Sequence, residues 1–326
     1  MLSTRVLHFG RYEMFFECRS SIDCECSLIR FQGAGFETML PLIKVEHADA
    51  LTQYTNDRRE SGQVEVRYQG ARLWRTMVSC YTALALTKST DRLIAFGGLA
   101  RQMANSRRSE YLAGVWRDSL QDDLLWDVRT TSRLKKSRPQ PRNAPTWSWA
   151  SVETAVGYWD IIVFTDLEGN AVEERAPFEH FTTIEDCRVS KTSIDEFGSI
   201  TQGHLTITGL VVEGLLEREV ETFENTERIN HSISILGSQL PIASDYFLDH
   251  DGPNKVDPGS AILCLRMSLY QEQSKQCLYS LILRQCPLEP NIFERIGTLR
   301  ISGSIGSVDP DSGIFHGAQT RTVVIA

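Results

Sequence analysis

The stretch Ala144-Pro145-Thr146-Trp147-Ser148-Trp149-Ala150-Ser151-Val152 lies near the middle of the chain and carries two of its six tryptophans. Side chains alternate between the two faces of a β-strand, so an extended conformation places Trp147 and Trp149 together on one face. All six tryptophans lie between Trp74 and Trp159. We therefore predict that the central core forms around this stretch and that both of its tryptophans are buried there.

The same two indole rings have an alternative use, because an exposed tryptophan can stack on a sugar or a nucleobase. We favour burial, since Trp147 and Trp149 belong to an apolar predicted strand beside a predicted helical block. The candidates for the structural core are aromatic residues of this central region: Trp74, Tyr81, Trp116, Trp126, Trp147 and Trp149.

The chain before this stretch divides into a predicted hairpin, over residues 1–30, and a predicted mainly helical block, over residues 31–128. Two short apolar runs in the first part are separated by turn residues at positions 10–11, a pattern typical of a hairpin. In the second part, apolar residues over 74–85 and 93–103 follow helical spacing. The polar residues at 89–91 supply an N-cap for the second helix.

A third helix is expected to begin at Ser109 and to carry Tyr111, Leu112, Val115 and Trp116 on one side. Residues 124–128 look extended. The short polar side chain of Ser109 is suited to an N-cap, because its oxygen can accept from a free backbone N–H group.

Residues 129–143 form a basic segment. It contains six lysines and arginines between Arg129 and Arg142 and no acidic residue. Pro139 and Pro141 disfavour a helix. A run of like charge is usually solvated, so we predict an exposed loop and prefer this interpretation to an anion or phosphate site.

Residues 144–326 are patterned mostly as short strands separated by glycine, proline and aspartate clusters. This spacing predicts an antiparallel sandwich or an open barrel, and hence an α+β fold for the whole chain. The expected strands cover 158–164, 181–189, 205–216, 232–236, 261–269, 277–283, 295–302 and 322–325.

Composition narrows the classes of partner and compartment. The 326-residue chain has a formal net charge of −8, and an acidic chain is a poor general binder of nucleic acid or anionic lipid. No apolar run approaches the roughly 20 residues that span a bilayer. The eight cysteines are irregularly spaced and no secretory signal is evident, so we expect free thiols in the cytoplasm.

No motif assigns a catalytic, cofactor-binding or metal-binding residue. Cys18, Cys24 and Cys26 with His8 contain suitable zinc ligands, but their spacing differs from that of structural zinc sites, and we expect ordinary thiols. The sequence has no G-x-S-x-G nucleophile elbow and no phosphate-binding P-loop. It therefore favours a chain without enzymatic activity, cofactor or metal, although an active site assembled from distant residues stays open.

Several motifs occur in an order and spacing that resemble one known family. Residues 2–10 (LSTRVLHFG) and 16–19 (FECR) resemble the end of the fungal heterokaryon-incompatibility (HET) domain, and the motifs after them resemble the region that follows this domain. These motifs are residues 74–81 (WRTMVSCY), 86–87 (LT), 91–93 (DRL), 98–100 (GLA), 111–116 (YLAGVW), 124–126 (LLW), 144–152 (APTWSWASV) and 293–297 (FERIG).

The resemblance implies the C-terminal part of such a protein, with most of the HET domain missing. The family is linked to non-self recognition between fungal strains and to programmed cell death. Its domain is similar to Toll/interleukin-receptor folds, for which NAD cleavage is plausible, and the residues for that activity would lie in the missing part. The expected function is an accessory or regulatory region whose protein partner is unknown, another HET-family chain being one candidate. Two alternatives stay open: a hydrolase-like enzyme with a site built from distant residues, and a carbohydrate- or peptide-binding β module.

Overall fold

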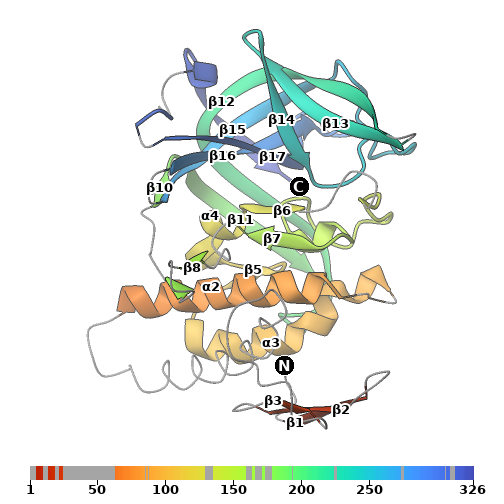
Figure 1. Cartoon of the computed structure of the whole chain (residues 1–326), viewed down its shortest axis with the longest axis vertical. Helices are drawn as coiled ribbons and strands as arrows, with labels where there is room; N and C mark the ends of the chain where they lie inside the picture. Colours follow the sequence, from red (N-terminus) through yellow and green to blue (C-terminus); the bar gives the residue numbers. More distant parts are fainter. Residues whose placement is uncertain are drawn as a thin grey trace.

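The computed structural model describes two groups of residues, separated by gaps. The first covers residues 5–9, 14–18, 22–24, 63–84, 86, 88–128, 135–158, 164–165 and 171–172. The second covers residues 178–192, 194–223, 226–272, 275–304, 306–308 and 313–326. The fold is α+β, as predicted. In Figure 1 a layer of helices lies below a large, mostly antiparallel sheet.

Two long helices form the helical layer: α2 (Gln63–Thr82) and α3 (Arg92–Arg107). A short 3-10 helix, η3 (Ser89–Asp91), precedes α3. Asp91 occupies the N-cap position, but its side chain makes no capping hydrogen bond. The polar residues at 89–91 thus mark the start of α3 as expected, while the hydrogen bond that motivated the prediction is not formed.

The prediction of a third helix beginning at Ser109 is wrong. The segment after Ser109 forms a tight hairpin of β4 (Tyr111–Leu112) and β5 (Val115–Trp116). Ala113 and Gly114 join the two strands with positive φ angles of 51° and 99°, a conformation incompatible with a right-handed helix. After the hairpin come a 3-10 turn, η4 (Arg117–Ser119), and a four-residue helix, α4 (Leu120–Asp123).

The C-terminal half is dominated by one nine-stranded sheet, with the order β10-β15-β16-β17-β14-β13-β12-β11 and β18 attached to β12 and β17. All its described pairings are antiparallel except β17–β18. Its strands are β10 (Phe178–His180), β11 (Thr183–Lys191), β12 (Ile200–Phe223), β13 (Thr226–Ile235), β14 (Ser238–Ser244), β15 (Ala261–Glu272), β16 (Lys275–Gln285), β17 (Ile292–Ser304) and β18 (Gln319–Ile325).

The 24-residue strand β12 turns this sheet into a partial ring, because it changes partners along its length. Its first part pairs with β11 and β18, its middle with β15, and its last part with β13. One hydrophobic cluster, which includes Leu216, Ile233 and Ile282, is formed by strands of this ring. A second cluster lies between the sheet and the helical layer and includes Trp74, Phe96 and Leu205.

The remaining elements are small. The predicted N-terminal hairpin forms: β1 (Arg5–Phe9) pairs with β2 (Met14–Cys18), and β3 (Ile22–Cys24) adds a third strand. The other pairs are β6 (Trp126–Val128) with β7 (Val156–Tyr158), and β8 (Phe164–Thr165) with β9 (Ala171–Val172). Within the described part of the chain, no helix is both long and apolar enough to cross a bilayer.

The central stretch 144–152 is not the predicted strand. Its backbone makes turns and then a 3-10 helix, η6 (Trp149–Ser151). The Ser148 hydroxyl accepts from Ala150 N at 3.1 Å and so caps this helix. Pro145 has no N–H for a ladder, and Thr146 N donates outside the stretch, to Ala326 O at 2.9 Å. Local turn hydrogen bonds thus replace the expected strand pairing.

Candidate functional site

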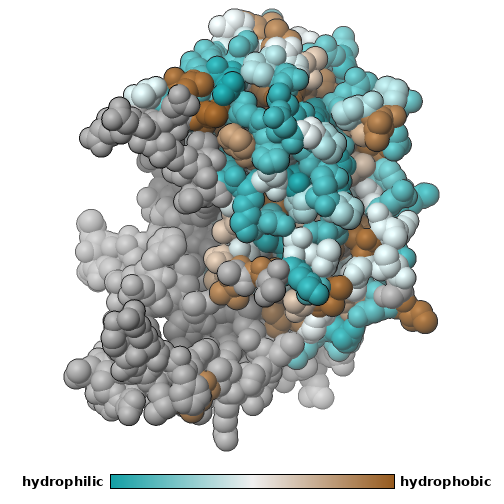
Figure 2. All heavy atoms as spheres, turned by 90° about the vertical axis from the view of Figure 1, so that its right-hand side faces the viewer, coloured by the Kyte–Doolittle hydropathy of each residue, from teal (hydrophilic) through white to brown (hydrophobic). Residues whose placement is uncertain are grey.

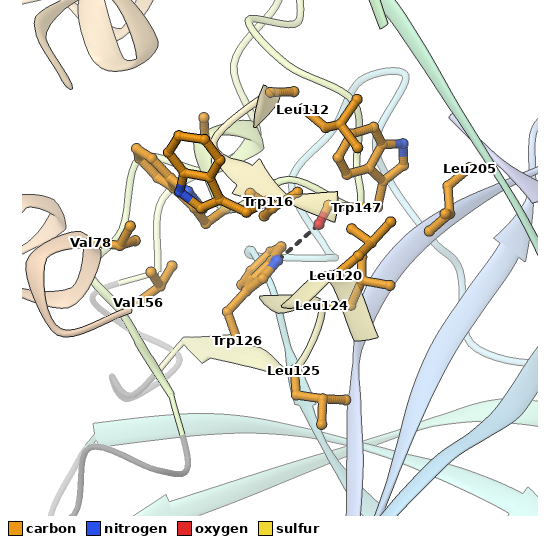
Figure 3. Packing of buried hydrophobic residues seen from close by; sticks show 14 of the residues in the cluster. Val78, Leu112, Trp116, Leu120, Leu124, Leu125, Trp126, Trp147, Val156 and Leu205 are labelled. Atoms are coloured by element: carbon orange, nitrogen blue, oxygen red, sulfur yellow. Dashed lines mark hydrogen bonds between the residues drawn. The ribbon is translucent and has the colours of Figure 1, made fainter. Parts of the chain in front are cut away.

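The tryptophans of the predicted core are enclosed. Trp74, Trp116, Trp126, Trp147 and Trp149 are 0% exposed, whereas Tyr81 is partly buried and packs against the cluster. Figure 3 shows Trp116, Trp126 and Trp147 among aliphatic side chains, with Trp126 Nε1 donating to Trp147 O at 3.0 Å. None of these five rings can stack on a ligand from solvent.

The β4–β5 turn joins the helical layer to the central stretch. Gly114 O accepts from Trp74 Nε1 at 2.9 Å and from Trp149 Nε1 at 2.7 Å. A Cβ atom at Gly114 would come within 2.6 Å of Trp149 Nε1. Two independent features therefore require glycine at position 114: its positive φ angle and the close approach of the Trp149 ring.

Strand β12 contacts the other end of the central stretch in a similar way. A Cβ atom at Gly203 would lie 2.4 Å from Pro145 Cγ and 3.1 Å from Trp147 Cζ2. The stretch 144–152 therefore contacts the sheet through Pro145 and Trp147 and the helical layer through Trp149. Its position at the centre of the fold agrees with the prediction, although its conformation does not.

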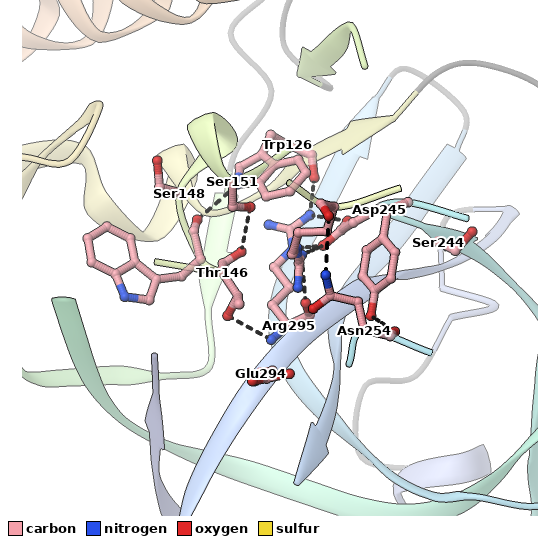
Figure 4. Close-up of polar contacts among 12 residues, drawn as sticks. Trp126, Thr146, Ser148, Ser151, Ser244, Asp245, Asn254, Glu294 and Arg295 are labelled. Atoms are coloured by element: carbon pink, nitrogen blue, oxygen red, sulfur yellow. Dashed lines mark hydrogen bonds and ion pairs between the residues drawn. The ribbon is translucent and has the colours of Figure 1, made fainter. Parts of the chain in front are cut away.

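A buried ion pair, shown in Figure 4, lies next to this core. Arg295 on β17 donates through Nε to Asp245 Oδ2 at 3.0 Å and through Nη2 to Asp245 Oδ1 at 3.1 Å. It also donates to Leu124 O at 2.6 Å and to Trp126 O, and its guanidinium lies 3.5 Å from the centre of the Trp126 ring. Both charged side chains are 0% exposed, so Arg295 fastens the sheet to the segment that precedes the basic residues.

The described part of the basic segment, residues 135–143, is an irregular and mostly solvated loop, as its charge predicts, with Arg138 as a buried exception. Residues 129–134 lie outside the described part, but Arg138 is 2% exposed, stacks on Tyr246 at 4.4 Å and donates to Arg295 O at 3.0 Å. Burial lowers the pKa of Arg138 below its ordinary value. Lys135 Nζ donates to Ser244 O at 2.7 Å, and burial lowers the pKa of Lys135 as well. The basic segment itself contains no acidic residue. Its positive side chains instead find carbonyl oxygens and carboxylates that are distant in sequence, which the sequence pattern does not reveal.

Glu294 is one of these distant acids. It accepts from Arg142 Nη2 and, at 2.7 Å, from Arg284 Nε. Burial alone would raise the pKa of Glu294, but hydrogen bonds and positive charge from Arg142 and Arg284 hold it below its ordinary value. Lys135, Arg138 and Arg142 tie the basic segment to β14 and β17, so part of its charge serves the packing of the fold.

A pocket of about 480 Å³ lies where η4 and α4 meet the β10–β11 connection. We call it the α4 pocket. It is lined by two short segments of chain: residues 117–122, and residues 180 and 182–184. These segments are far apart in sequence, so no local pattern could have revealed the cavity.

A serine, a histidine and an aspartate meet beside the α4 pocket. His180 Nδ1 lies 2.8 Å from Ser268 Oγ, and His180 Nε2 lies 3.3 Å from Asp122 Oδ1. His180 and Ser268 are direct cross-strand partners of β10 and β15, which explains their contact. A serine beside a base that is oriented by an acid is the arrangement of nucleophilic catalysis.

One observation argues against that chemistry. Ser268 is 0% exposed and is not among the residues that line the pocket, so its hydroxyl is not presented to a substrate. The imidazole bridges α4 and β15 instead, and we assign it a positioning role.

The predicted cysteine cluster is only partly described. Cys18 lies on β2, Cys24 on β3 and His8 on β1, whereas Cys26 falls outside the described residues. Where the structure describes side chains, no three His, Cys, Asp or Glu residues are grouped to hold a metal ion. Comparison of the chain with protein-family models, with curated proteins and with solved structures found no match.

Proposed function

We propose that this chain is a non-catalytic regulatory region that acts with a HET-family protein in fungal non-self recognition and programmed cell death. The observation that carries the proposal is the separate N-terminal sheet. The HET-like motifs at residues 2–10 and 16–19 overlap β1 and β2, and the order β1-β2-β3 gives β1 one neighbour among the described strands. Its outer edge can accept a strand from a partner.

The position of the small sheet supports this role. In Figure 1 it lies at the bottom of the molecule, apart from the nine-stranded sheet. Leu7 on β1 is 49% exposed. A strand of a HET-family partner would pair with the β1 backbone and cover this side chain.

The remaining surface gives less support to the carbohydrate-binding alternative. The large hydrophobic side chains that are exposed among the described residues are aliphatic, not aromatic. On the face shown in Figure 2, coloured residues are mostly hydrophilic, and hydrophobic ones are dispersed among them. A sugar-binding platform of exposed aromatic rings is therefore absent from the described residues.

Two experiments test the proposal. A HET-family protein from the same fungus should co-purify with the full chain, and Leu7→Asp should weaken this association, whereas Leu288→Asp, at a site 90% exposed and remote from β1 in sequence, should not. Purified chain should release no nicotinamide from NAD. Turnover that survives repurification and is lost on substitution of His180 would contradict the non-catalytic assignment.

The hydrolase alternative keeps one specific observation in its favour, the Ser268–His180–Asp122 arrangement. A fluorophosphonate probe, which labels activated serines, distinguishes the two functions. The regulatory proposal expects no label on Ser268, because its hydroxyl is buried. Labelling of the parent that disappears in Ser268→Ala would support the hydrolase.

A further inference from the structure

The segment that joins β14 to β15, residues 245–260, has no regular secondary structure and lies against the β12–β13 hairpin. We call it the strap. Leu248 and Val256 of the strap are 0% and 4% exposed and pack into the hydrophobic cluster of the ring. The strap is therefore an integral part of the fold.

The second part of the strap is anchored by groups that do not change charge in mild acid. Arg284 donates to Pro253 O at 3.0 Å and to Lys255 O at 2.8 Å. Gly259 N donates to Leu216 O at 2.7 Å. Because an arginine stays protonated in proteins and a backbone hydrogen bond does not titrate, these anchors are insensitive to pH.

The turn at residues 247–252 is attached differently, through Asp249. Asp249 Oδ1 lies 3.1 Å from Arg218 Nε, and Asp249 Oδ2 lies 3.0 Å from His231 Nε2. Arg218 and His231 are direct cross-strand partners of β12 and β13, so a single carboxylate spans the hairpin. Elsewhere in the described chain, His231 Nε2 and Asp249 Oδ2 make no hydrogen bond. These two buried atoms thus depend on each other.

The surroundings of His231 disfavour a positive charge. Its side chain is 4% exposed, and the charged groups near it among the described residues are Asp249 of the strap, Arg218 of β12 and Lys135 of the basic segment. The two cations already outnumber the carboxylate, so an imidazolium buried here is unfavourable. Accordingly, burial lowers the pKa of His231; Asp249 opposes this shift, whereas Lys135 and Arg218 add to it.

We propose that the strap is a pH-sensitive cover: in mild acid His231 takes up a proton from solvent, and the turn 247–252 lifts from the β12–β13 hairpin. Lifting brings the imidazolium into contact with water, while the anchors at Arg284 and Gly259 stay in place. It also uncovers Leu248, so acid exposes apolar surface on the ring. The inference rests on the strap alone and is independent of the association of β1 with a HET-family partner.

The direction of the effect follows from proton linkage. A histidine that is harder to protonate under the closed turn than in water, where its pKa is about 6.5, favours the closed turn above that pH. This preference is lost as the pH falls, and each unit of pKa difference changes the ratio of closed to open turn about tenfold. A comparison of pH 7.5 with pH 5.0 covers the window, because pH 5.0 still lies above the ordinary aspartate pKa of about 3.9.

Hydrogen exchange of the full chain, corrected for the intrinsic pH dependence of exchange, measures the opening at single amides. The reporters are Phe247 N, which donates to Lys136 O at 3.2 Å, and Val256 N, which donates to Leu248 O at 3.0 Å. Their protection should fall at least about tenfold between pH 7.5 and pH 5.0, whereas that of Gly259 N in the same strap should not change. Unchanged protection of both reporters, or an equal loss at Gly259 N, would overturn the proposal.

Three variants identify the sensor. His231→Gln keeps a polar side chain that cannot titrate, so the protection of the reporters should be the same at both pH values. His250→Gln removes an exposed histidine of the strap itself, whose Nδ1 lies 2.9 Å from Asp251 O, and should retain the parental pH dependence. Lys135→Met leaves His231 in place but removes a like charge beside it, so the fall in protection should become smaller. A pH dependence that survives in His231→Gln, disappears in His250→Gln or is unaltered in Lys135→Met would show that His231 is not the sensor.

Discussion

The central stretch 144–152 and the basic segment before it, 135–142, are both irregular, but they differ in burial and in the forces that hold them. The stretch 144–152 is buried throughout, whereas Arg138 is the buried residue of the basic segment. The first packs Trp147 and Trp149 into an apolar cluster. The second places Arg138 against Tyr246 and beside the Arg295–Asp245 pair. Irregular backbone is tolerated inside a protein when its polar groups have partners, and the comparison shows that apolar contact and charge pairing can each secure such a segment.

The largest effect is expected from truncation in the apolar segment. Trp149→Ala should lower the free energy of unfolding by roughly 4–5 kcal/mol, the upper part of the range for large-to-small core changes. The variant loses the contacts with Tyr81 and Phe96 and leaves Gly114 O with one donor fewer. Urea unfolding measures the change, with Leu288→Ala, at a site 90% exposed, as the control. A midpoint equal to that of the parent would show that the ring is not packed.

Next in size is the removal of charge beside the basic segment. Arg295→Met should cost roughly 3–4 kcal/mol, because it leaves the Asp245 carboxylate buried without its partner. The double variant Arg295→Met/Asp245→Leu should recover part of this loss, since both charges of the pair are then removed, although Arg138 loses its contact with Asp245 at 3.7 Å. Arg321→Met, which breaks an exposed pair with Glu213, is the matched control and should unfold like the parent. No recovery in the double variant would mean that the bonds to Leu124 O and Trp126 O matter more than the ion pair.

A smaller effect is expected from the cap inside the apolar segment. The Ser148 hydroxyl donates to Ala113 O at 2.5 Å and accepts from Ala150 N at 3.1 Å. Ser148→Ala should therefore cost about 1–2 kcal/mol. Thr192→Ala removes a hydroxyl bonded to Ser199 O on the exposed surface and should cost less. Equal unfolding midpoints for these two variants would show that the cap contributes nothing.

The smallest effect concerns the pH dependence of the charged region. A carboxyl group whose pKa is depressed on folding stabilises the protein above its unfolded pKa, about 4.3 for glutamate, and this contribution is lost as the pH falls through the folded value. Glu294→Gln should thus be less stable than the parent at pH 7, and the difference should shrink as the pH falls below the unfolded pKa of about 4.3 and through the lower pKa of the folded protein. Urea unfolding at a series of pH values measures it. A difference that does not change with pH would exclude the ion pairs with Arg142 and Arg284 as its source.

Periodicity predicted the elements whose contacts are local or repetitive. The spacing of Trp74, Met77, Val78 and Tyr81 identified α2, and alternating strands with turn residues identified most of the sheet. A helix was wrongly predicted from the spacing of Tyr111, Leu112, Val115 and Trp116. Two short strands joined by a turn with positive φ angles bring the same residues together. Strand β14 was missed, since its pattern is weak and contains a proline at position 241.

The α4 pocket could not be predicted at all. Asp122, His180 and Ser268 come from three segments, and their spacing in the chain carries no signature. The scattered histidines gave no reason to single out His180. What brings it to Ser268 is the register of β10 on β15, and strand register is a property of the assembled sheet.

The sequence by itself determined the α+β class, the small N-terminal hairpin, and the central place of the five tryptophans that the structure describes, because composition and periodicity express the burial of apolar surface. Tertiary structure decided the conformation of the central stretch and the burial of Arg138 within the basic segment. The physical reason is that a hydrogen bond or an ion pair depends on the distance between two groups in space and not on their separation in the sequence. Thr146 N finds Ala326 O, and Arg295 finds Asp245, only after the sheet has closed around them.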